Sequence, residues 1–295
     1  MSMDLLSNYL NILNILFTVM IEFSNTNIDY SKSIISISTI LDMLETPFDQ
    51  KGVAEKTCNK YFNDPNSQYF QKTVDQICEM WTAKGAESCR YGSLLDDYIG
   101  VVLTGTEDDM ELYKLDNDID GDTRLAGLVQ SFDDFYALLS KSGDMEFVTR
   151  EQTLYLKVDE NHYVKGRFDA LFKNKRTGKW VVIDWKSSGD VDKVPNKWTQ
   201  TFLGPAKIYP ALNWYRYTNQ LYFYKRALIE GGYLPEGTTY DDIEVMIVQL
   251  PGHTCDSGLN YAIHKPAFIF DTEWLDKVYV FGIKKNEIMN RKCQQ

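Results

Sequence analysis

The spacing of apolar residues divides the chain into a helical first half and a sheet-forming middle. Apolar positions three and four apart predict helices over about 38–45, 50–62, 66–84, 91–101 and 123–141. Phe70, Val74, Ile77 and Trp81 keep this spacing, which is typical of a helix face buried in a core. The pattern therefore predicts a helical N-terminal region over residues 1–144.

Short apolar runs separated by polar turns replace the helical pattern after residue 150. Three strands are predicted over 151–158, 163–172 and 179–188, joined by the turns "DENH" and "KNKRTG". This arrangement is typical of a β-meander at the centre of a sheet. A long helix over about 206–231 then ends at a pair of glycines.

Two further strands and a helix complete the chain. The strands are predicted over 243–250 and 261–270, and Asp271 is suited to cap a helix over 272–290. The element order predicts an α/β (α+β) fold with one central mixed sheet flanked by helices. We expect residues 1–144 to pack on a core of 145–295 as one integrated domain.

The N-terminal stretch 3–23 is apolar enough to raise the question of a membrane anchor. Asn8, Asn11, Asn14, Thr18 and Glu22 interrupt it at steps of three and four, which places them on one stripe of a helix. Spanning helices carry few such polar residues, and no basic segment precedes the stretch. We expect an amphipathic helix on the core or on a partner, and no membrane association.

Composition is that of a soluble globular protein, with 295 residues, 44% apolar and 25% charged. The net charge of −11 argues against an indiscriminate nucleic-acid binder. However, residues 165–230 hold thirteen Lys and Arg against five Asp and Glu, which allows a local anion-binding surface. Five scattered cysteines without a CxxC pair favour a reducing, cytoplasmic compartment.

The stretch "VVIDWKSS" (181–188) carries the candidate chemistry. Asp184 and Lys186 are two residues apart on a predicted strand, so both point to one face. Asp169 and Glu151 fall on the neighbouring strands, where carboxylates can converge on a hard cation such as Mg²⁺. Such an ion polarises a phosphodiester and lowers the pKa of a bound water, which Lys186 would orient. The alternative is a plain Asp–Lys ion pair at a strand edge.

Three segments resemble the PD-(D/E)XK nucleases, in the RecB-like branch with mitochondrial genome maintenance exonucleases and phage relatives. They are "GRFDALF" (166–172), "VVIDWKSS" (181–188) and "QLYFY" (220–224). The resemblance implies a restriction-endonuclease-like core and Mg²⁺ or Mn²⁺ as cofactor. Asp169, Asp184 and the Trp185 carbonyl would bind metal, Lys186 would be the catalytic lysine, and Glu151, Gln220 and Tyr224 would complete the site.

Two positions depart from the family pattern. Many members have a G-x-x-x-H motif upstream whose His binds metal, whereas Gly92 is followed here by Asp96 at the His position. Asp96 can bind Mg²⁺ or Mn²⁺ as His can, although Asp97 is an alternative inward residue. Some relatives also bind an iron–sulfur cluster through closely spaced C-terminal cysteines. Cys255 and Cys293 are far apart, so no cluster is expected.

These features predict a metal-dependent deoxyribonuclease, an exonuclease by its family branch, acting in DNA recombination, repair or replication. Its partner would be DNA, as single strands or free ends. If the source is a phage or virus, it would act in the host cytoplasm. One alternative is a catalytically inactive nucleic-acid-binding or assembly protein on the same fold. Another is an RNA endonuclease.

Overall fold

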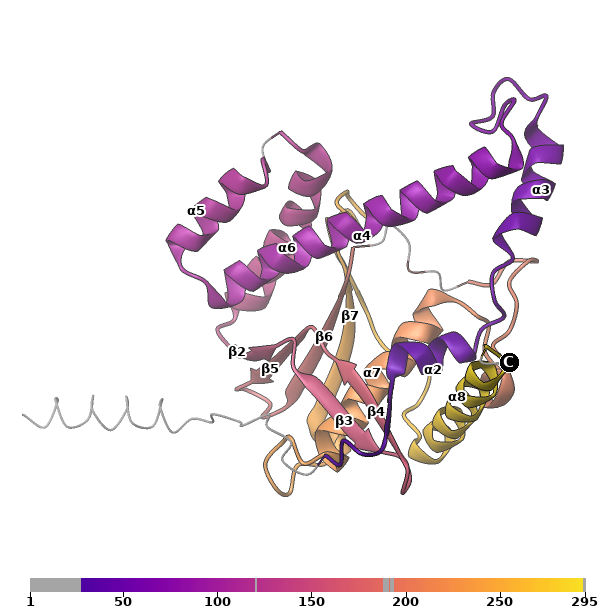
Figure 1. The fold of residues 1–295 in the computed structure, drawn as a ribbon. Coiled ribbons are helices and arrows are strands. Elements are labelled where there is room, and N and C mark those ends of the chain that lie inside the picture. The colour runs from indigo at the N-terminus through magenta and orange to yellow at the C-terminus, as the bar shows by residue number, and fades with distance from the viewer. Residues whose placement is uncertain (1–27, 120, 188–190, 192–193, 294–295) are drawn as a thin grey trace, which may run out of the picture.

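The computed structural model describes residues 28–119, 121–187, 191 and 194–293. In these ranges, seven α-helices flank two mixed β-sheets, which confirms the expected α+β class (Figure 1). The predicted helix over 3–23 lies outside the described residues. No helix in the described ranges is long and apolar enough to cross a membrane.

The helices agree with the apolar spacing except in three places. They are α2 (Ile37–Met43), α3 (Gln50–Tyr61), α4 (Val74–Thr104), α5 (Glu107–Asp116), α6 (Thr123–Lys141), α7 (Asn213–Glu230) and α8 (Thr272–Cys293), with 3₁₀ turns η1 (Gly204–Ala206) and η2 (Tyr240–Asp242). The two helices expected over 66–84 and 91–101 form the single helix α4, which begins only at Val74, so Phe70 lies outside it and is exposed. The helix expected over 206–231 begins only at Asn213, after the 3₁₀ turn η1. Helix α5 was not predicted because it buries no side chain and so shows no apolar stripe. Asp271 caps α8 as expected, since its carboxylate accepts the Trp274 N–H at 3.1 Å.

The strands form one five-stranded and one three-stranded sheet. The larger sheet has the order β2 (Met145–Arg150), β5 (Ala170–Asn174), β6 (Trp180–Lys186), β7 (Ile243–Gln249) and β8 (Ala262–His264), with β6 and β7 parallel and the other pairs antiparallel. The smaller sheet has the order β1 (Ser33–Ser36), β4 (His162–Arg167) and β3 (Thr153–Lys157), with β1 parallel to β4. The strand expected over 261–270 is therefore only three residues long.

The expected three-stranded meander is wrong because its second strand changes sheet. The chain leaves β4 after Arg167, turns through Phe168 and Asp169, and starts β5 in the other sheet. The preceding segment breaks at the same level, where Glu151 has a φ of +52° and donates its N–H to the Asp169 carbonyl at 3.1 Å. Two linked breaks thus split one long hairpin between two sheets.

Strand β6 is covered on both faces, which explains its near-continuous apolar sequence. Trp180 and Val182 belong to the core cluster formed with α7 and α8. Val181, Ile183 and Trp185 belong to the cluster formed with α4 and α6. Helices from the first and last parts of the chain therefore pack on the same central sheet (Figure 1).

Helix α4 extends beyond the sheet toward α3 (Figure 1). Its residues 82–90 are exposed on every side, whereas Tyr91, Leu95 and Ile99 further along are buried against α6 and the sheet. Helix α3 packs mainly against α4. Only the second half of α4 can position residues beside β6.

Gly166, the glycine of "GRFD", lies where α2 and α7 meet over β4. A β-carbon there would be 2.6 Å from a Phe223 ring carbon and 2.9 Å from a methyl carbon of Ile37. We expect Gly166→Ala to lower the free energy of unfolding by about 1–3 kcal/mol because the packed helices must shift. Urea unfolding measures this. Gly85→Ala is the control, since nothing lies within 4 Å of its added carbon, and it should be neutral or stabilising by up to about 1 kcal/mol.

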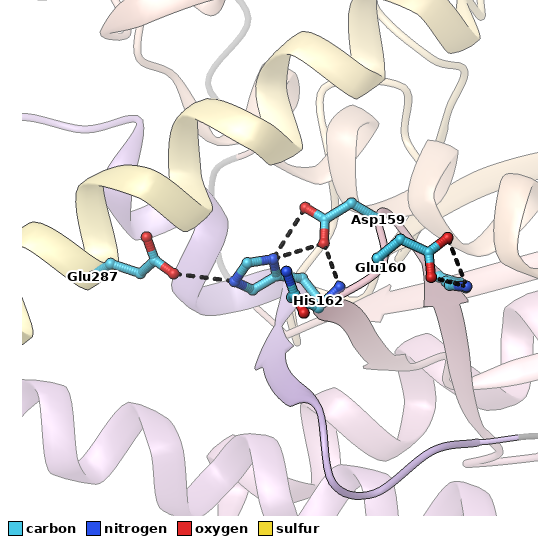
Figure 2. Close-up of polar contacts among 6 residues, drawn as sticks. Asp159, Glu160, His162 and Glu287 are labelled. Carbon is cyan, nitrogen blue, oxygen red and sulfur yellow. Dashed lines mark hydrogen bonds and ion pairs between the residues drawn. The ribbon is translucent and has the colours of Figure 1, made fainter.

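His162 joins the β3–β4 turn to α8. Its Nδ1 is 2.8 Å from the Asp159 carboxylate and its Nε2 is 3.0 Å from that of Glu287, so both nitrogens face acceptors (Figure 2). Burial lowers the pKa of His162, but the Asp159 and Glu287 carboxylates outweigh this effect and raise the pKa overall.

Because the pKa of His162 is raised, the free energy of unfolding should fall as pH rises through that pKa. The imidazolium stabilises the fold fully below about pH 6.5, and this stabilisation is lost as pH rises through the folded-state pKa. At pH 6 the free energy of unfolding of wild type should exceed that of His162→Gln by about 1 kcal/mol, and this difference should shrink above pH 7. Unfolding curves at several pH values test this, with the exposed His253→Gln as control. A constant difference would contradict the charged pairing.

Candidate active site

The candidate site is built at the carboxyl end of β6. The Asp184 side chain is fully buried, and its Oδ2 is 2.5 Å from the Lys186 Nζ, whose side chain is 19% exposed. The two side chains share a face because strand residues two apart point the same way. Apart from this ion pair, neither Asp184 oxygen accepts a hydrogen bond from the described residues. A buried carboxylate with so few partners is costly unless a further cation binds it.

Asp169 reaches the same place from the break between β4 and β5. Its Oδ2 accepts the backbone N–H of Trp185 at 2.6 Å, which fixes the carboxylate against β6. Burial, reinforced by the neighbouring Asp184 charge, raises the pKa of Asp169 to about 8. The two aspartates therefore repel each other when both are ionised.

Lys186 remains charged between these carboxylates. Burial lowers the pKa of Lys186, but the Asp184 and Asp169 charges outweigh that effect and raise it. The Nζ lies 4.7 Å from the centre of the Tyr217 ring, which lies on α7. This geometry gives the ammonium a fixed position at the edge of the cavity described next.

A cavity of about 290 Å³ opens between α4, the end of β6 and α7. It is lined by Gly92, Leu95, Asp96, Ile99, Asp169, Trp185, Lys186, Ser187 and Tyr217. The structure therefore brings together the candidate residues Asp96, Asp169, Trp185 and Lys186, with Asp184 buried beside them. The cavity can admit a phosphate group next to two carboxylates and an ammonium.

The residues present fit a hard divalent cation. Carboxylate oxygens are the preferred ligands of Mg²⁺, which commonly uses one or two of them together with water and phosphate oxygens. Asp169 and Asp184 provide these, and neither Asp184 oxygen is otherwise hydrogen-bonded within the described residues. No preformed group of three His, Cys, Asp or Glu ligands occurs among the described residues.

Asp96 and Asp97 differ in where they point. Asp96 lines the cavity, and burial raises its pKa despite a nearby Arg150. Its Oδ1 is 3.2 Å from the Arg150 guanidinium. Asp97 is exposed and lines a different surface pocket, which Arg150 and Glu151 also line. The inward residue of the pair is therefore Asp96.

Glu151 does not line this cavity. Its carboxylate is 3.4 Å from Arg150 and 3.2 Å from Arg167, and the residue lies at the break between β2 and β3 instead of opening a strand. Its backbone, however, supports the Asp169 turn through the Asp169 carbonyl. Glu151 thus contacts the site through its N–H and through two arginines.

Gln220 and Tyr224 lie one step further along α7, in a second cavity of about 430 Å³. Gln220 donates to the Tyr224 hydroxyl at 2.7 Å, and that hydroxyl donates to the Arg167 carbonyl at 2.7 Å. The remaining lining is Ser36, Ile37, Ser38, Thr153, Tyr155, Lys165, Gly166 and Arg167, with no carboxylate. Tyr217, Gln220 and Tyr224 share one face of α7, so the two cavities follow each other along that helix.

Part of the positive charge in the basic segment 165–230 is paired within the fold. Six of its cations are ion-paired with carboxylates: Arg167, Arg176, Lys179, Lys186, Arg216 and Arg226. Among the described residues of the segment, six lysines make no ion pair: Lys165, Lys173, Lys175, Lys197, Lys207 and Lys225. Of these, Lys165 lines the second cavity.

Sequence reasoning missed Arg150 and Tyr217. Tyr217 precedes Gln220 by three residues on α7, so the helical spacing contained a signal for it. Arg150 ends a strand that was not predicted, and no motif marks it.

No protein-family model matches the sequence, and no curated protein matches it either.

The Asp169 carboxylate is buried next to the Asp184 charge, so we expect the metal-free protein to become more stable when the Asp169 charge is removed. Because the folded-state pKa is about 8, the wild-type protein loses stability as pH rises from about 4 to 8. Asp169→Asn keeps an oxygen for the Trp185 N–H and removes the charge. We expect it to raise the free energy of unfolding by at least about 1 kcal/mol at pH 8 in EDTA.

Thermal unfolding from pH 5 to 9 measures this effect. The exposed Asp97→Asn should show no such gain. Added Mn²⁺ should stabilise wild type more than Asp169→Asn. A loss of stability in Asp169→Asn at pH 8 would contradict a raised pKa for this carboxyl.

Proposed function

We propose that the chain is a metal-dependent nuclease of the PD-(D/E)XK kind, with a restriction-endonuclease-like core, that hydrolyses DNA phosphodiester bonds. The observation that carries the proposal is the meeting of Asp169, Asp184 and Lys186 beside one cavity at the end of β6. By its resemblance we place it among exonucleases of recombination, repair or replication.

Each residue has a role that follows from its position. Asp169 and Asp184 hold Mg²⁺ or Mn²⁺, with the Trp185 carbonyl and Asp96 as neighbouring oxygens. The bound ion would polarise the phosphodiester and lower the pKa of a water molecule. Lys186, kept protonated by Asp184, orients that water and stabilises negative charge on the phosphoryl oxygens. Tyr217 confines the ammonium from the α7 side.

The second cavity supplies the path of the substrate strand. Residues 217, 220 and 224 of α7 span about 10 Å along the helix axis, so a strand with its phosphate beside Lys186 extends toward Gln220 and Tyr224. Lys165 and the hydroxyls of Ser36, Ser38 and Thr153 are donors for a neighbouring phosphate. This lining suits an extended single strand or a free end.

Loss of the site lysine should abolish cleavage. We expect Lys186→Met to lower the rate at least about 100-fold, because the positioned ammonium no longer stabilises charge. The assay is digestion of end-labelled single-stranded and duplex DNA, and matched RNA, with Mg²⁺ or Mn²⁺. The product ladder reports the direction of digestion.

Lys179→Met is the matched control, since Lys179 precedes the same strand at its other end and pairs with Glu244 at 3.1 Å. It should cleave as wild type does. Equal activity in Lys186→Met would place the chemistry elsewhere. Absence of cleavage by wild type on every substrate would favour a nucleic-acid-binding role, and cleavage of RNA alone would favour an RNA endonuclease.

A further inference from the structure

The last residue of β2, Arg150, packs its side chain against α4 beside Asp96 and Gly100. The side chain is only 16% exposed although it carries a permanent charge. Its Nη2 donates to the Asp96 carbonyl at 3.1 Å and lies 3.2 Å from the Asp96 carboxylate. The same nitrogen is 3.4 Å from the Glu151 carboxylate.

Helix α4 has a gap that receives this guanidinium. A β-carbon at Gly100 would lie 1.6 Å from the Arg150 Nη1 and 2.8 Å from its Cζ, so any larger residue would displace the side chain. Gly100 is itself buried within the helix. An interior helical glycine is otherwise unfavourable by about 1 kcal/mol relative to alanine. Its presence here therefore has a physical reason in the position of Arg150.

We propose that Arg150 takes the place of a second metal ion, so that the site binds one divalent cation. This inference rests on the proposed function. Arg150 is a positioning residue, since it acts through Asp96 and lines neither the 290 Å³ nor the 430 Å³ cavity. It neutralises Asp96, the carboxylate that would otherwise combine with Asp169 and Asp184 to bind a second ion.

The formal charges support a single cation. Asp96, Glu151, Asp169 and Asp184 face the cations Arg150, Arg167 and Lys186, which leaves a net charge of −1. One divalent ion and one phosphodiester bring this cluster to neutrality. A second divalent ion would leave two positive charges uncompensated in a partly buried site, which is unfavourable.

The count of bound Mn²⁺ tests the proposal without measuring activity. Equilibrium dialysis of the full chain at pH 7.5, with electron paramagnetic resonance of the bound ion, should give one Mn²⁺ for wild type. Arg150→Met frees the Asp96 carboxylate that lines the cavity, and we expect two Mn²⁺. Gly100→Ala displaces the guanidinium while keeping the arginine, and it should also give two. Arg150→Lys retains a positive charge and should give one.

Arg176→Met is the control, because it removes an exposed arginine paired with Asp144 away from the site and should still give one Mn²⁺. Two ions in wild type would overturn the inference and leave the proposed nuclease intact. One ion in both Arg150→Met and Gly100→Ala, with circular dichroism showing folded proteins, would also overturn it. No Mn²⁺ bound by wild type would overturn the proposed function as well.

Discussion

The burial of the Asp184 carboxylate at the end of β6 is the constraint on which the surrounding structure depends. A fully buried carboxylate requires compensation, and the chain provides Lys186 two residues later on the same face. That placement works only while β6 stays in register between β5 and β7, since a slip of one residue would turn both charges to the opposite face. The apolar residues of β6, packed on both sides, fix that register.

The second carboxylate depends on a break in the sheet. Asp169 is available because the chain changes sheets between β4 and β5, which frees its side chain to accept the Trp185 N–H. The break is supported by the Glu151 N–H and by the Tyr224 hydroxyl, which hold the carbonyls of Asp169 and Arg167. The glycine three residues before Asp169 allows α2 and α7 to close over β4. In "GRFD", Gly166 thus serves the packing of the two helices, and Asp169 supplies the carboxylate of the site.

The features that could be predicted from the sequence are those set by local periodicity. The helices α3, α6 and α8, the turns of the meander, and the shared face of Asp184 and Lys186 follow from apolar spacing and strand geometry. The change of sheet at Asp169 could not be predicted, because an alternating apolar pattern continues through it and the break is stabilised by contacts distant in sequence. Strand β2 and Arg150 were missed for a related reason, since all six residues of β2 are partly or fully exposed.

Two arginines of α7 show that part of the charge in the basic segment has a structural role. Arg216 pairs with Asp42 and Glu45, and Arg226 with Glu230 and Asp276, so both fasten α7 to its surroundings. These charges are used within the fold and add little long-range attraction for a polyanion. If the site binds DNA, the unpaired lysines of the segment must supply the phosphate contacts, and the salt dependence of the affinity reports how many of them do so.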